Sequence, residues 1–315
     1  MSFEFRREGR VWLEYDSKFY LLHTTREVEF SQTFKQEAVA KKNLYNTSSV
    51  IEGSSITEAN PANFSFTMFL VDEAVKYQHI PLDLLIQRDN TNPEKYLNTF
   101  NLYFVYSDYS PEVYYKIESC MFTSGSFVIP RNGIMTVELS GEGSRLTRVS
   151  GSTPGSIYAG YDATPTYAVS KHFDVYLGGD TSQFKLDNIL GVSFEVQNSI
   201  SWTSNSTLQK SLAVTDANNS IYPESFTMES RSMSGSIQQY VSNSVDSSNE
   251  NIQTWAENTT VNVKAGLSST NYQFELTLTN NASFTNRTGF GEVMVQNYDF
   301  RLMDNPIIWS NTINY

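Results

Sequence analysis

The chain contains very little cysteine. Cys120 is the one cysteine in 315 residues, so no disulfide can form within the chain. A chain of this size without disulfides is typical of proteins made in a reducing cytoplasm. The first residues, MSFEFRREGR, lack the apolar segment of a secretory signal. No apolar run approaches the roughly 18 residues that a membrane-spanning helix needs. We therefore expect a protein that is made in the cytoplasm and has no contact with a membrane.

Basic residues are scarce as well. The chain has 22 Lys and Arg against 34 Asp and Glu, and its formal net charge is −12. Both halves of the sequence are acidic, so neither resembles a basic domain attached to an acidic one. Proteins that hold a nucleic acid by its backbone need clustered Lys and Arg. The charge therefore argues against a protein that binds DNA or RNA through the phosphates.

Residues in catalytic or metal-binding patterns are missing too. The three histidines, His23, His79 and His172, lie in separate segments with no helical i, i+4 pairing. No Cys-x-x-Cys, G-x-x-x-x-G-K-[ST] or G-x-S-x-G motif occurs. The glycine cluster SGEGS at 140–144 follows a strand pattern and opens no helix, which is typical of a tight turn. The sequence predicts no enzyme activity, no metal site and no cofactor.

Aromatic and small polar residues are abundant instead. The chain has 20 Phe, 19 Tyr and 4 Trp, whereas charged residues make up only 18%. Asn, Ser and Thr fill most of the remaining polar positions. Aromatic and β-branched side chains suit a pleated, half-buried surface. The composition predicts a mainly-β fold and not a helical bundle.

Three segments of the first half return in the second half in the same order. FYLLHTTREVEFSQTF matches FKLDNILGVSFEVQNSISW, NPANFSFTMFL matches YPESFTMESRS, and YKIESCMFTSGSFV matches YQFELTLTNNASFT. Phe19 and Phe184 are 165 residues apart, Phe64 and Phe226 are 162 apart, and Tyr115 and Tyr272 are 157 apart. This slow decrease is what small loop deletions after a tandem duplication would produce. We predict two domains, residues 1–165 and 166–315.

Each half has the same predicted plan: an early strand pair, a long polar stretch, a strand led by proline, a short helix and long alternating strands. The first helix is expected over IPLDLLIQR, with Pro81 in its first turn. The second is expected over VDSSNENIQTWAEN, with Ser247 and Glu250 as a capping box. The polar stretches near 38–60 and 203–221 are predicted to be arms or loops. The linker between the halves is expected at 149–166, which is rich in Gly, Ser, Thr and Pro.

Several segments resemble bacteriophage major tail tube proteins. The resemblance lies in VQNSISW, in ESCMFTSGSFVIPRNGIMTVELSGEGSRL and in MVQNYDFRLMDNPIIW. It is nearest to the duplicated-domain type found in long-tailed siphophages. It implies two tandem phage-tail-tube-like β-sandwich or β-barrel domains, each with a short flanking helix. It also implies a homotrimer, in which three chains form a ring of six domains and the rings stack into a hollow tail tube.

The resemblance implies a role and a set of partners as well. The chain would be a structural virion protein, made in the host bacterial cytoplasm, whose tube conducts double-stranded DNA into the host without binding it specifically. Expected partners are further copies of the chain, the tape-measure protein in the lumen during assembly, the tail terminator, and tail tip or baseplate proteins. The polar arms would become ordered against a neighbouring ring. The acidic charge agrees with this role, because an acidic lumen repels phosphate.

Two strand patterns supply candidates for the lumen surface. Glu27 and Glu29 alternate with Val28 and Phe30, which is the pattern of a solvated strand face and not of an acid–base pair. The counterpart in the second half alternates with Val192, Phe194 and Val196. A face that meets only the outer solvent would explain the pattern equally well. The lumen candidates are Glu27, Glu29, Ser31, Ser193, Glu195 and Gln197.

Other functions remain open at this point. The aromatic content is also compatible with a carbohydrate-binding or adhesive β-sandwich protein, which would stay monomeric or form a small closed oligomer. A second alternative is another tail ring component with the same fold, such as a baseplate or tail-tip protein. An esterase or glycosidase has no supporting arrangement of residues. Tube folds serve both contractile and non-contractile tails, and only the duplication favours the non-contractile type.

Overall fold

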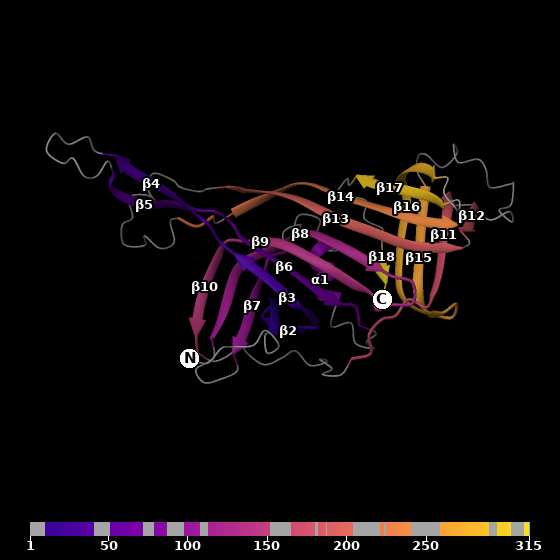
Figure 1. Ribbon diagram of the computed structural model, residues 1–315, viewed down its shortest axis with the longest axis horizontal. Helices are drawn as coiled ribbons and strands as arrows, with labels where there is room; N and C mark the ends of the chain where they lie inside the picture. Colours follow the sequence, from indigo (N-terminus) through magenta and orange to yellow (C-terminus); the bar gives the residue numbers. More distant parts are fainter. Residues whose placement is uncertain are drawn as a thin grey trace.

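The fold, given by a computed structural model, is built almost wholly from β-strands (Figure 1). Among the residues that the structure describes, α1 (His79–Ile86) is the one α-helix. The mainly-β fold predicted from the composition is therefore confirmed. The described residues are 10–40, 51–71, 79–86, 98–107, 113–151, 165–179, 182–186, 188–203, 221–223, 225–240, 259–289, 295–303 and 312–314.

The first half of the chain forms one outer sheet and part of a larger sheet. The first outer sheet has the order β2-β1-β7-β8-β10. Its strands are β1 (Arg10–Tyr15), β2 (Lys18–Leu22), β7 (Phe100–Ser107), β8 (Val113–Ile129) and β10 (Arg145–Ser150). The larger sheet contains β3 (Thr24–Ser31), β6 (Ala62–Phe69), β9 (Thr136–Gly143) and the end of β8. β8 belongs to both sheets, because it pairs with β7 up to Cys120 and with β9 from Met121 onward.

The second half has the same strand arrangement. The second outer sheet has the order β12-β11-β15-β16-β18. Its strands are β11 (His172–Gly179), β12 (Ser182–Leu186), β15 (Thr259–Ser268), β16 (Asn271–Gly289) and β18 (Thr312–Asn314). β13 (Ile189–Thr203), β14 (Ser225–Tyr240), β17 (Val295–Met303) and the end of β16 belong to the larger sheet. β16 therefore passes from an outer sheet to the larger sheet, as β8 does.

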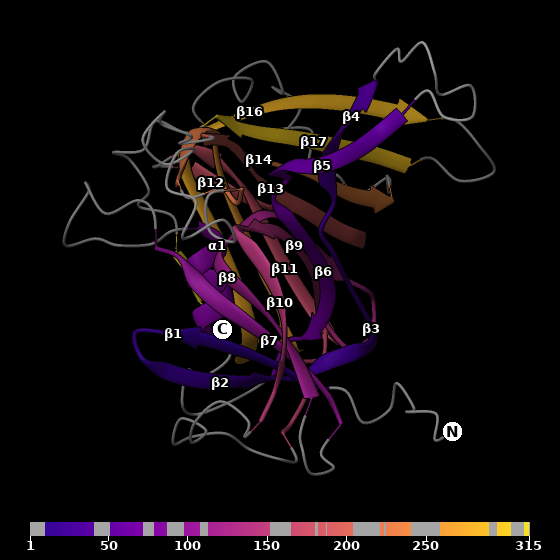
Figure 2. The same ribbon diagram turned by 90° about the vertical axis from the view of Figure 1, so that its left-hand side faces the viewer.

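The larger sheet is continuous between the two halves, and we call it the shared sheet. Its order is β3-β6-β9-β8-β13-β14-β17-β16. The inner joint, where the halves meet, is the antiparallel pairing of β8 with β13, from Ile129 opposite Val192 to Ser124 opposite Gln197. The sheet curls into a half-barrel, and β3 and the end of β16 lie at its two ends (Figure 2).

One side of the shared sheet is apolar and forms the core against the outer sheets. The alternation along β6 buries Phe64, Phe66 and Met68, as expected for a strand with one face in the core. Phe127 of β8 stacks on Phe194 of β13 with ring centroids 4.3 Å apart. This contact crosses the inner joint, so the core is continuous from one half to the other.

The helix α1 covers part of this apolar side. Leu82, Leu84 and Leu85 are buried, and Pro81 lies in the first turn, where its missing N–H costs no hydrogen bond. Leu85 lies over Gly125 of β8, where a Cβ atom would be 2.2 Å from Leu85 Cδ2. Glycine at this position allows the helix to lie close to the sheet. The helix predicted over IPLDLLIQR is confirmed.

A hairpin arm of β4 (Phe34–Ala40) and β5 (Ile51–Ala59) projects beyond the rest of the molecule (Figures 1 and 2). It continues the β3–β6 ladder, because the Asn60 N–H donates to the Thr33 carbonyl. The described part of the polar stretch near 38–60 is thus a regular strand pair, which agrees with the expectation of an arm rather than a loop. The second predicted helix, nearly all of the stretch 203–221 and most of the linker 149–166 lie outside the described residues.

Candidate functional site

The lumen candidates all point away from the core. Glu27, Glu29, Ser31, Ser193 and Gln197 are exposed, and Glu195 is half-buried. Their neighbours in sequence lie on the other side of the sheet: Val28 and Phe30 are half-buried, and Val192, Phe194 and Val196 are buried. The predicted alternation of both segments is confirmed.

The register places both segments on the same side of the shared sheet. Residues directly opposite one another in neighbouring strands share a face. One such row crosses six strands, through Glu29, Ser65, Ser140, Ser124, Gln197 and Ser232. The two candidate segments are therefore parts of one surface, which we call the polar face.

Further charged residues lie on the polar face. Glu138 lies opposite Ser126, which lies opposite Glu195. Arg301 lies opposite Ser234, the other neighbour of Glu195. Neither Glu138 nor Arg301 is among the lumen candidates, although the alternation in MTVELSG and YDFRL places both on the solvated side of a strand.

The described part of the polar face is strongly acidic. Arg301 is its one basic side chain among the residues whose side chains the structure describes. Its carboxylates are Glu27, Glu29, Glu138, Glu142, Glu195 and Asp299.

Two hollows open on the polar face, one across the inner joint and one in the first half. The larger, of about 510 Å³, is lined by Ser126, Glu195, Ser234 and Arg301 among others. The smaller, of about 290 Å³, is lined by Glu29, Ser65, Ser140 and Glu142 among others. Several serines and one glycine line each hollow, and their short side chains leave the sheet surface open.

Hydrogen bonds hold several polar-face side chains in place. Gln197 Nε2 donates to Glu195 Oε1 at 3.1 Å, and Trp202 Nε1 donates to Glu142 Oε2 at 2.7 Å. At the end of β3, Gln32 Nε2 donates to the carbonyls of Asn60 and Ser144. These contacts limit the motion of the carboxylates and anchor β3 at the end of the sheet.

The opposite side of the sheet carries a buried polar cluster at the inner joint. Asn198 Nδ2 donates to the carbonyls of Leu85 and Phe122. Arg231 donates from Nε to Asn198 Oδ1 and from Nη1 to the Ile86 carbonyl, both at 2.8 Å. The last carbonyls of α1 lack partners within the helix, and a cation suits the negative end of its dipole. Two residues of the second half thus cap a helix of the first half.

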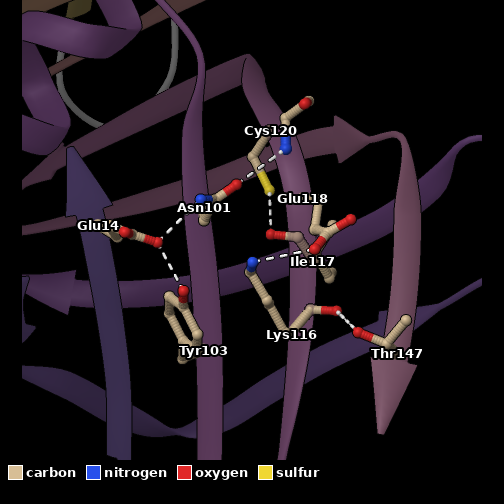
Figure 3. A network of polar contacts seen from close by, with 9 residues as sticks. Glu14, Asn101, Tyr103, Lys116, Ile117, Glu118, Cys120 and Thr147 are labelled. Atoms are coloured by element: carbon tan, nitrogen blue, oxygen red, sulfur yellow. Dashed lines mark hydrogen bonds and ion pairs between the residues drawn. The ribbon is translucent and has the colours of Figure 1, made fainter. Parts of the chain in front are cut away.

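Each outer sheet has a carboxylate held by a tyrosine. In the first, Glu14 Oε2 accepts hydrogen bonds from Asn101 Nδ2 at 2.8 Å and from Tyr103 OH at 2.5 Å (Figure 3). Burial and the bond to Glu14 raise the pKa of Tyr103 well above its usual value. Asn101 Oδ1 also accepts from the N–H of Ser119, whose φ of 51° marks the point where β8 bends toward the shared sheet.

In the second outer sheet the carboxylate is Asp174, which is buried. Burial opposes its charge, but hydrogen bonds from Lys185, Tyr272 and His172 outweigh burial and hold the pKa of Asp174 below its usual value. The bond to Asp174 raises the pKa of Tyr272 to about 12. These groups strengthen the outer sheets and lie away from the polar face.

The described residues contain no group of His, Cys, Asp and Glu side chains that could hold a metal ion. Cys120 is buried, and burial raises the pKa of its thiol. Within the described part of the chain, no helix has the length and apolar character needed to cross a membrane.

Comparison with known proteins gives one family. The family model of the Bacteriophage Baseplate Tube Protein Family matches residues 1–310. No curated protein matches the chain. The match spans both halves of the fold, including the whole shared sheet. The chain therefore belongs to the bacteriophage baseplate tube protein family and is a structural component of a phage tail.

Proposed function

We propose that three copies of the chain join head to tail into a closed ring, which forms a tube segment at the phage baseplate. The inner joint carries this proposal. β8 occupies the same place in the first half as β16 does in the second, and β3 corresponds in the same way to β13. The pairing of β8 with β13 is therefore a template for pairing the end of β16 with β3 of the next copy.

Such pairing would leave no open strand at either end of the shared sheet. Exposed strands invite uncontrolled association, and closure into a barrel removes them. A head-to-tail contact forms a ring when its rotation closes, and otherwise forms a filament. Three copies of a double domain supply six similar positions, which is the arrangement that the tail tube resemblance implies.

We also propose that residues 1–165 and 166–315 are two tail-tube-like domains produced by one duplication. The matched strand orders support this. The three repeated segments also include parts of counterpart strands: β2 and β12, β6 and β14, and β8 and β16. The match of Phe64 with Phe226 is out of register, however. If Ser126 and Ser283 are counterparts, the ladders make Arg231 the counterpart of Phe64.

In this ring the polar face lines the channel, and Glu27, Glu29, Ser31, Ser193, Glu195 and Gln197 face the DNA. Phosphate would be repelled by the carboxylates, and the short side chains would leave the wall smooth. Double-stranded DNA could then pass through without specific binding. The tape-measure protein would occupy the same channel during assembly.

The family name supports a place at the baseplate, where a ring of this kind would meet tail tip proteins on one side and tube rings on the other. The projecting β4–β5 arm favours a second candidate, the major tail tube itself, because an arm that reaches a neighbouring ring would help many identical rings to stack. Contact with the tail terminator belongs to that second candidate.

The test is native mass spectrometry of the purified protein, followed by negative-stain electron microscopy. Discrete trimers with a central channel would support the baseplate ring. Long hollow tubes would support the major tail tube. A protein that remains monomeric at all concentrations and binds glycans would overturn both and favour the adhesive β-sandwich.

A further inference from the structure

The inner joint has like charges on its two sides. Ser126 lies on the polar face at the edge where β8 meets β13, with Glu138 opposite it on β9 and Glu195 opposite it on β13. Glu138 is exposed and Glu195 is half-buried. Two carboxylates that flank one serine weaken a joint rather than strengthen it. This joint tolerates them because its strands belong to one chain, which holds them at a high effective concentration.

The corresponding row at the β16 end carries the opposite charge. Ser126-Phe127 in β8 recurs as Ser283-Phe284 in β16. Ser283 lies opposite Arg301 of β17, just as Ser126 lies opposite Glu138 of β9. Arg301 therefore occupies in the second half the place that Glu138 occupies in the first. It is exposed on the polar face.

On β3, carboxylates lie at the position along the strand that corresponds to Glu195 on β13. Glu195 lies opposite Ser234, the neighbour of Arg301. The counterpart of Ser234 is Thr67, which lies opposite Glu138. On β3, Val28 lies opposite Phe66 and Thr24 lies opposite Met68, with a register shift between them, so the residues beside Thr67 lie between Thr24 and Val28, next to Glu27. Both Glu27 and Glu29 are exposed.

We propose that a charge contact between Arg301 of one copy and Glu27 and Glu29 of the next selects the joint between copies. This inference rests on the proposed ring. With the register of the inner joint, Ser283 pairs with the start of the Glu27–Glu29 segment, and Arg301 lies two strand spacings away, about 10 Å. Extended arginine and glutamate side chains can span that distance between them.

The same charges disfavour the wrong pairings. Two β3 strands brought together would place Glu27 and Glu29 against the same carboxylates of the other copy, and like charges across a joint are repulsive. Two β16 ends brought together would leave Arg301 of each copy without the carboxylates of β3. Pairing β3 with β16 is the arrangement that places opposite charges together. The surface charge thus favours head-to-tail closure over a two-fold dimer.

The test compares trimer formation by wild type and by Arg301→Glu, using sedimentation velocity over a range of protein and salt concentrations. We expect the variant to need at least about tenfold more protein for half-maximal assembly, because it replaces attraction by repulsion. Adding Glu27→Arg and Glu29→Arg to the variant should restore assembly. Glu138→Lys, a charge reversal of the opposite sign at the inner joint, should leave assembly unchanged.

The outcomes separate the two proposals. If wild type forms no rings, the proposed function fails. If wild type forms rings and Arg301→Glu forms them equally well at low salt, the charge contact is overturned while the ring stands. A second measurement checks the register: Ser283→Cys combined with Glu27→Cys should give a covalent trimer on oxidation, and neither single variant should. Rings without this cross-link would overturn the register.

Discussion

The two halves of the molecule have the same strand order but different side chains where each meets a neighbour. On the apolar side, Phe30 and Phe64 are cross-strand partners in the first half, and Asn198 and Arg231 are cross-strand partners at the corresponding place in the second. The first pair is apolar, and Phe30 stacks on Phe104 at 4.6 Å. The second pair is polar and caps the end of α1. The fold requires a side chain that points to the core at each of these positions. Whether that side chain is apolar or polar depends on the group it packs against, which is Phe104 in the first half and the end of α1 in the second.

The two outer sheets also share a position but differ in the side chains that surround it. Glu14 and Asp174 both accept a hydrogen bond from a tyrosine. The cross-strand partner of Glu14 is Asn101, whereas that of Asp174 is Lys264. A carboxylate in the second strand of the sheet is common to both halves, and the groups that stabilise it differ.

The largest expected loss of stability comes from removing one member of the Asn198–Arg231 pair of the second half. Arg231→Ala leaves the Ile86 carbonyl and Asn198 Oδ1 without the hydrogen bonds that Arg231 donates, so we expect a loss of about 3–5 kcal/mol in the free energy of unfolding. Urea denaturation measures this loss. Arg301→Ala, which removes an exposed arginine, should change the free energy by less than about 0.5 kcal/mol. Similar values for the two variants would contradict the capping role.

A smaller effect is expected from two glycines of the shared sheet, one in each half. A Cβ at Gly141 would lie 2.3 Å from the Met121 carbonyl oxygen, and one at Gly235 would lie 2.7 Å from the Ser193 carbonyl oxygen. Backbone atoms must move in both cases, so Gly141→Ala and Gly235→Ala should each cost about 1–3 kcal/mol. At Gly191 a Cβ would meet nothing within 4 Å. The midpoint of thermal unfolding of Gly191→Ala should therefore be close to that of wild type.

The free energy of unfolding should depend on pH differently in wild type and in Asp174→Asn. Because the folded pKa of Asp174 is lowered, its charge stabilises the fold above the unfolded pKa of about 4. This contribution is lost as the pH falls through the folded pKa. At neutral pH Asp174→Asn should lower the free energy of unfolding by about 1–2 kcal/mol. The gap from wild type should narrow below about pH 4, and a constant gap would count against the ionised carboxylate.

The smallest effect on stability is expected on the polar face. Glu29→Lys combined with Glu195→Lys changes two solvated side chains, so the free energy of unfolding should move by less than about 0.5 kcal/mol each. If the polar face lines the channel, the added positive charge should retain DNA. Phage carrying both changes should assemble tails yet deliver DNA poorly. Full infectivity would contradict the proposal that the polar face lines the channel.

Much of the fold follows from alternation and repetition in the sequence. The pattern around Glu29 and Glu195 predicts which side chains leave the core, and Pro81 followed by leucines predicts α1. The repeat predicts two domains that come from one duplication, which stays a proposal that the matched strand orders support.

Other features could not be predicted, because they depend on contacts between distant segments. No local pattern indicates that Arg231 is buried, since its partners lie 33 and 145 residues away along the chain. The register that aligns Glu138 with Arg301 is equally hidden, because it comes from ladders between strands that are not adjacent in sequence. The pairing of β8 with β13, on which the proposed ring rests, joins two strands from different halves, so it is not visible in either local pattern.

We propose that the pairing at the inner joint is repeated between copies and closes a ring of three. Electron cryomicroscopy of the assembled protein tests it most directly. We expect a three-chain ring with β16 of each chain hydrogen-bonded to β3 of the next and the polar face toward the channel. A ring closed through other strands, or one whose channel is lined by the outer sheets, would contradict it.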